Sequence, residues 1–116
     1  MVFLEKIFVD KSYIYKKSSY KKLALFGASE IARKTRVAFS DLKFDLIFDN
    51  SANLWGEVED NIEIKKPLDL KKFKKKYFII ISTTSYNEVA KQLINMGLNA
   101  GEDFVVSPIL NNYQYI

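Results

Sequence analysis

The sequence contains neither cysteine nor histidine. Without cysteine, the chain can form no disulfide, thiolate nucleophile or thiolate metal site. Without histidine, it lacks the usual general base at neutral pH and the commonest metal ligand. Catalysis would have to rest on Asp, Glu, Lys, Tyr or Ser. We therefore expect a domain with no catalytic residues and no metal site of its own.

Long hydrophobic runs are also missing. No stretch approaches the roughly eighteen consecutive apolar residues of a transmembrane helix, so no membrane span is expected. The N-terminal segment MVFLEKIFVDK is interrupted by Glu5, Lys6 and Asp10 and has no small-residue cleavage site. This pattern argues against a signal peptide and predicts a cytoplasmic location.

Arginine is scarce beside lysine, although the formal net charge is +4. Readers of nucleic acid rely on arginine for bidentate contacts, so no specific nucleic-acid partner is expected. The segment KKPLDLKKFKKK, residues 65–76, gathers many of the lysines. Such a run is typical of a solvated face, here with Phe73 as its buried anchor. Binding to an anionic polymer or to membrane headgroups is the alternative.

The 116 residues, of which 48% are hydrophobic, suit a single globular domain. Strands are predicted at residues 22–26, 44–48, 61–64, 77–82 and 103–107, helices at 29–39 and 86–96, and a brief turn or helix at 67–76. Alternating strands and helices predict an α/β fold, a small three-layer Rossmann-like domain over residues 22–107 with a mostly parallel sheet of about five strands. Residues 1–21 are predicted as a helix or irregular arm. Residues 108–116 form an unassigned tail.

The segment LALFGASEIARK, residues 23–34, places a glycine between a predicted strand and a predicted helix. Dinucleotide-binding folds carry G-x-G-x-x-G here, for the tight turn, the approach of pyrophosphate and the packing of the helix. Gly27 matches the first glycine, Ser29 stands at the second and Ala32 at the third. Ser29 either crowds a phosphate or hydrogen-bonds to it. The candidate binding loop comprises Gly27, Ala28, Ser29, Glu30 and Ile31.

Two further candidate loops follow predicted strands. Asp49 lies where an acid contacts ribose hydroxyls in dinucleotide-binding folds, although Asp49 and Asn50 could equally form a plain turn. Ser82, Thr83 and Thr84 follow another strand, where hydroxyls suit a phosphate or carboxylate as well as helix capping.

Three more patterns have structural interpretations. The spacing of Ser85 and Glu88 predicts a capping box. Trp55, the only tryptophan, could be a stacking platform, but a lone tryptophan in a small domain is typically packed against the core. The acids between residues 57 and 63 fit no compact oxygen-ligand loop and are interpreted as a surface hairpin.

Four segments occur in an order that resembles a known family. They are FGASEIA (26–32), IFDNSANLWG (47–56), IEIKKPLDL (62–70) and FIIISTTSYNEVAKQLINMG (78–97). Together they resemble the Rossmann-like domain of bacterial surface-polysaccharide enzymes, including the N-terminal domain of sugar-nucleotide N-acetyltransferases and the nucleotide-binding domain of nucleoside-diphosphate-sugar epimerases and dehydratases. The resemblance implies that residues 27–31 and 49–50 face a nucleotide or nucleotide-sugar, with a UDP-sugar or NAD(P) as the candidate.

The functional expectation follows from this resemblance. It is a non-catalytic nucleotide or nucleotide-sugar-binding domain that serves bacterial surface polysaccharide or glycan biosynthesis, beside a partner catalytic domain. The alternative is a degenerate Rossmann-like interaction or oligomerisation module, whose N-terminal arm docks on a second copy, forming a homodimer, or on a partner enzyme.

Overall fold

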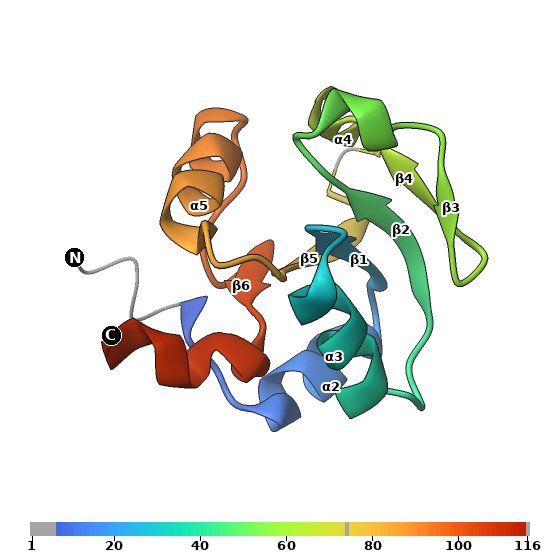
Figure 1. Ribbon diagram of the computed structural model, residues 1–116. Helices are drawn as coiled ribbons and strands as arrows, with labels where there is room; N and C mark the ends of the chain where they lie inside the picture. The colour runs from blue at the N-terminus through green and yellow to red at the C-terminus, as the bar shows by residue number, and fades with distance from the viewer. Residues whose placement is uncertain (1–6, 74, 116) are drawn as a thin grey trace.

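The computed structural model describes residues 7–73 and 75–115 as an α/β domain (Figure 1). The first half of the chain forms α2 (Lys11–Ser18), β1 (Lys22–Phe26), α3 (Glu30–Ala38), β2 (Phe44–Phe48), η1 (Ala52–Leu54), β3 (Val58–Glu59) and β4 (Ile62–Lys65). The second half forms η2 (Pro67–Asp69), α4 (Leu70–Phe73), β5 (Tyr77–Ile81), α5 (Tyr86–Asn95), β6 (Phe104–Val106) and η3 (Pro108–Tyr115). Residues 1–6 of the expected arm lie outside the described residues.

One six-stranded sheet has the order β3-β4-β2-β1-β5-β6. The five longer strands run parallel, and only the two-residue β3 pairs antiparallel, with β4. Each predicted strand overlaps an observed one, because a strand buried on both faces is an almost continuous apolar run. The Rossmann-like α/β prediction is confirmed.

Alternate side chains of the strands point to opposite faces of the sheet and pack into two separate hydrophobic cores. The sheet is therefore the middle layer of three. On one face Phe26, Phe48 and Ile81 pack with residues of α4 and α5. On the other, Leu25 and Ile80 pack with residues of α2 and α3. In Figure 1, α4 and α5 stand apart from each other toward the top of the view, whereas α2 and α3 lie close together toward the bottom.

Helix α2 lies in the predicted N-terminal arm. Asp10 caps it by accepting a hydrogen bond from the Tyr13 amide at 3.3 Å. Ile14 is fully buried in the core, and Phe8 forms a parallel bridge with Val106 of the edge strand β6. These contacts place α2 against the sheet.

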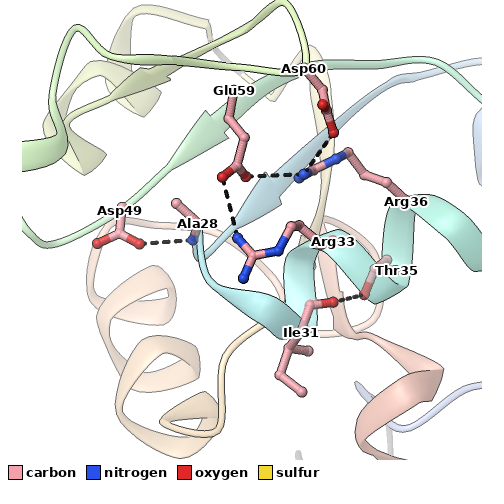
Figure 2. Close-up of polar contacts among 8 residues, drawn as sticks. All are labelled: Ala28, Ile31, Arg33, Thr35, Arg36, Asp49, Glu59 and Asp60. Carbon is pink, nitrogen blue, oxygen red and sulfur yellow. Dashed lines mark hydrogen bonds and ion pairs between the residues drawn. The ribbon is translucent and has the colours of Figure 1, made fainter.

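The acidic segment between residues 57 and 63 forms the predicted surface hairpin. Asp60 (φ 51°) and Asn61 (φ 64°) both adopt positive φ, as a type I′ hairpin turn requires. Glu59 accepts hydrogen bonds from Arg33 and Arg36 of α3, the second at 3.0 Å (Figure 2). The acids therefore tie the hairpin to α3.

A buried acid anchors the loop before β6. Asp103 is 1% exposed, accepts a hydrogen bond from the Asn99 amide at 2.7 Å, and pairs with Lys21 at 3.2 Å and Lys75 at 3.3 Å. Burial alone would raise the pKa of Asp103, but the amide and the two ammonium groups outweigh it and hold that pKa below its ordinary value. The ionised carboxylate therefore stabilises this loop.

Residues 7–73 and 75–115 contain neither a candidate membrane span nor a candidate metal site. No helix in these ranges is long and apolar enough to cross a bilayer. Within the same ranges, no three acidic side chains come together in a way that could hold a metal ion.

Candidate functional site

The order of the strands creates a switch point beside β1. Strand β2 pairs with one edge of β1, whereas β5 pairs with the other edge of β1. The loops that follow β1 and β5 therefore diverge at the carboxyl edge of the sheet, where open α/β folds bind their ligands. All three candidate loops of the sequence lie along this edge.

Gly27 is required by the approach of β5. Its φ is +117°, and a Cβ atom at this position would lie 2.7 Å from the backbone oxygen of Ser82. The Gly27 amide donates to the Phe48 carbonyl at 2.7 Å, and the Ser82 amide donates to the Phe26 carbonyl at 2.7 Å. The glycine thus permits the ends of three strands to pack, whether or not a ligand is present.

Asp49 reaches back to the loop after β1. Its Oδ2 accepts a hydrogen bond from the Ala28 amide at 2.9 Å, and its Oδ1 accepts one from the Ser51 amide at 2.8 Å. Figure 2 shows the carboxylate against the loop that leads into α3. A carboxylate at this amide repels a phosphate, so the structure brings two predicted site residues together in a way that disfavours an anion at Ala28.

The start of α3 is only partly suited to an anion. Ser29 occupies the N-cap position, but its side chain makes no capping hydrogen bond. The first-turn amides, including those of Glu30 and Ile31, have no acceptor within the helix. However, the Glu30 side chain already places a negative charge in this first turn, and Ile31 is directed into the core.

The loop after β5 divides its hydroxyl groups between the core and the surface. Ser82 is fully buried, and its hydroxyl lies 3.4 Å from that of Thr35. Thr83 accepts a hydrogen bond from the Ser85 amide at 3.3 Å, and Thr84 is exposed. The predicted capping box is wrong: Ser85 has ψ 37° in place of the extended backbone of an N-cap, and its side chain makes no capping hydrogen bond.

A groove of about 930 Å³ opens at the carboxyl edge, between α5 and the segment that contains η2 and α4. We call it the carboxyl-edge groove, and its polar and aromatic lining includes Asn50, Trp55, Lys66, Lys71, Lys91, Gln92 and Asn95. Leu68 and Met96 add apolar surface, and Glu88 supplies an acid. Three lysines against one acid give the groove a positive character.

Trp55 stands in this groove and not in the core, which corrects the packing expected for a lone tryptophan. Its Nε1–H donates to the Asp49 carbonyl at 2.7 Å, and 41% of the residue remains exposed. The hydrogen bond satisfies the polar end of the indole and fixes the ring beside the loop after β2. The remaining ring surface is available for stacking.

Asn50 and Gln92 form a closed pair of hydrogen bonds across the groove. Asn50 Nδ2 donates to Gln92 Oε1 at 2.9 Å, and Gln92 Nε2 donates to Asn50 Oδ1 at 2.9 Å. Asn50 follows β2, whereas Gln92 lies in the middle of α5. The pair connects the loop after β2 with the helix after β5.

Sequence reasoning identified Asn50 but missed Gln92 and the three lysines as members of one site. Glu88, Gln92 and Met96 recur at spacings of four residues, which places them on one face of α5. This face borders the buried positions Val89 and Leu93. The periodicity was available in the sequence, but the opposing wall from η2 and α4 was not.

Comparison with known proteins identifies one family and one similar fold. The family described as C2185-like, N-terminal, matches residues 19–102. No curated protein matches the sequence. A crystal structure of RSP, a Rex-family repressor, aligns with a TM-score of 0.54 and 16% identity, covering 88% of this chain and 61% of the repressor chain. At this identity the likeness concerns the fold, and the chain matches less than two thirds of the repressor's length.

These matches overturn the resemblance to bacterial surface-polysaccharide enzymes. The matching family is a different one, and the similar structure is a repressor. The four segments share a strand, a glycine turn and a helix in the order that any Rossmann-like sheet imposes. They therefore predicted the fold correctly and the family wrongly, and the nucleotide-sugar and polysaccharide roles lose their support.

Proposed function

We propose that this chain, which belongs to the C2185-like, N-terminal family, is a nucleotide-binding domain whose ligand occupies the carboxyl-edge groove. The observation that carries the proposal is the meeting of an exposed indole with three ammonium groups in one groove. An indole stacks on a nucleobase, and lysine side chains bind phosphate as point charges. The groove also falls within the usual range of ligand-site volumes, roughly 300–1,000 Å³.

The arrangement of charges favours a phosphate in the groove over one at the glycine loop. At the loop, the Ala28 amide is already paired with the Asp49 carboxylate, and Glu30 adds a second negative charge. In the groove, Lys66, Lys71 and Lys91 are brought together from the segment after β4, from α4 and from α5. We therefore place the phosphate near these lysines and the base near Trp55.

We expect binding without turnover. The sequence has no histidine or cysteine, and the polar residues that line the groove are three side-chain amides, an indole, three lysines and a single acid. Such a set can hold and orient a ligand, but it offers no nucleophile paired with a base. The domain would then present a nucleotide or respond to one.

Tryptophan fluorescence tests this proposal directly, because Trp55 is the only tryptophan and lies in the groove. AMP, ADP and NAD titrated at low ionic strength should change its emission in a saturable way. Lys91→Ala should weaken binding about fivefold, the effect of losing roughly 1 kcal/mol of charged interaction. The matched control is Lys43→Ala, since Lys43 is 90% exposed and lies just before the amino end of β2.

The fluorescence titrations distinguish a nucleotide-binding domain from an interaction or oligomerisation module. Saturable binding that depends on Lys91 and not on Lys43 supports the nucleotide-binding proposal. Unchanged emission with every nucleotide at millimolar concentration would contradict it and would favour the interaction or oligomerisation module expected as the alternative.

A further inference from the structure

The Asn50–Gln92 pair presents an unusual chemical edge to the groove. A primary amide carries a hydrogen-bond donor next to an acceptor, and here two such edges satisfy each other through two bonds of 2.9 Å. Both bonds are exposed to solvent. Exchange of one partner for a ligand with the same donor–acceptor pattern would conserve the number of hydrogen bonds, so it costs little.

The two amides differ in how firmly the fold holds them. Gln92 is half-buried and stands in the middle of α5, next to the fully buried Leu93. Asn50 is exposed and belongs to the loop between β2 and η1. Gln92 is therefore the fixed member, and Asn50 is the member that a ligand can displace.

Trp55 lies next to this amide pair. Its indole nitrogen is bonded to the carbonyl of Asp49, the residue that directly precedes Asn50. A planar base stacked on the exposed indole therefore brings its edge to the neighbourhood of the pair. Stacking alone tolerates any base, because every base has a π face. Selection among bases must come from hydrogen bonding.

We propose that Gln92 is the base-reading residue of the carboxyl-edge groove and that it selects adenine, whose N6 and N7 atoms replace the Asn50 amide. This inference rests on the proposed nucleotide-binding function. The adenine N6 amino group donates to Gln92 Oε1, and adenine N7 accepts from Gln92 Nε2, the usual pairing of an amide side chain with adenine. At the same edge, guanine offers two acceptors, N7 and O6, and leaves the amide oxygen without a donor.

The test compares AMP, GMP and 7-deaza-AMP by the emission of Trp55. The three ligands carry the same phosphate and ribose, so the ratio of their dissociation constants isolates the base. The wild-type chain should bind AMP about tenfold more tightly than GMP or 7-deaza-AMP, which lies at the lower end of the discrimination that one bidentate pair of hydrogen bonds provides. Ribose 5-phosphate reports the contribution of the phosphate alone.

Three variants assign the discrimination to one side chain. Gln92→Ala should reduce the AMP to GMP ratio to near one. Asn50→Ala should retain the ratio and bind AMP at least as tightly as the wild type, since Gln92 no longer has a competing partner. Asn95→Ala is the matched control, because Asn95 also lines the groove from α5 but lies outside the amide pair.

The proposal is overturned if the wild-type chain binds AMP and GMP equally, or if Gln92→Ala preserves the preference for AMP. Loss of the preference for AMP in Asn50→Ala would also overturn it, because Asn50 and not Gln92 would then be the residue that recognises the base. Equal binding of all nucleotides leaves the proposed function intact. Absence of binding by any nucleotide contradicts both.

Discussion

Replacing Gly27 by alanine tests how the loop after β1 is built. Two costs are expected. A non-glycine residue at φ +117° carries backbone strain of about 1–2 kcal/mol. In addition, the new Cβ would lie 2.7 Å from the Ser82 carbonyl oxygen, a backbone atom that can move only if the ends of β1 and β5 separate. That movement weakens the 2.7 Å bond from the Ser82 amide to Phe26, worth about 1 kcal/mol.

The expected loss of unfolding free energy for Gly27→Ala is therefore about 2–3 kcal/mol. Gly97→Ala and Gly56→Ala provide matched controls. Both glycines have positive φ, +94° and +90°, but a Cβ at either position meets nothing within 4 Å. These two variants carry only the backbone strain, so each should lose about 1–2 kcal/mol of unfolding free energy.

Equilibrium unfolding in urea measures all three variants, with the midpoint and slope compared at constant protein concentration. The difference between Gly27→Ala and the two controls isolates the steric contact with β5. If Gly27→Ala costs no more than Gly97→Ala, the close approach of the strand ends does not constrain this position, and our account of the glycine is wrong.

Substitutions at three further residues test side-chain roles by urea unfolding. The folded-state pKa of Asp103 lies below its unfolded value, so its contribution to stability is complete above about pH 4 and disappears as the pH falls through the folded pKa. The Asp103→Asn variant should therefore be less stable than the wild type at pH 7, and its free energy of unfolding should change less steeply with pH below 4. Equal pH slopes in the variant and the wild type would contradict this. Asp49→Ala removes two hydrogen bonds, including that from Ala28, and should cost about 2 kcal/mol, whereas a cost near zero would refute a structural role. Lys17 is buried and pairs with the exposed Glu102. Lys17→Ala should lower the free energy of unfolding by about 2 kcal/mol and Lys17→Met by under about 1 kcal/mol, because the packed aliphatic part of the side chain contributes more than its charge. Equal losses in the two variants would show that the charge contributes more.

The fold could be predicted from the sequence because each central strand is buried on both faces. The run YFIIIS at residues 77–82 and the glycine after KLALF are local signals of a parallel sheet. The short strand β3 carries no comparable run: it consists of Val58 and Glu59, and its pairing depends on the turn at Asp60 and Asn61.

The candidate site was harder to predict because its walls come from distant segments. Asp49 was identified by its spacing from Gly27, but its partner, the Ala28 amide, could not be inferred without coordinates. Trp55 was expected in the core on composition alone, and its hydrogen bond to a loop carbonyl holds it at the surface instead. Gln92 lies 42 residues from Asn50, and no local pattern connects the two.

The central claim is that the ligand site of this domain is the carboxyl-edge groove and not the glycine loop. Amide-resolved NMR of the ¹⁵N-labelled chain titrated with AMP tests it most directly, because the single indole N–H and the side-chain amides of Asn50 and Gln92 give their own signals. The account predicts saturable shifts at Trp55, Asn50 and Gln92, with small shifts at residues 28–31. Shifts confined to residues 27–31, or no shifts anywhere at millimolar AMP, would contradict it.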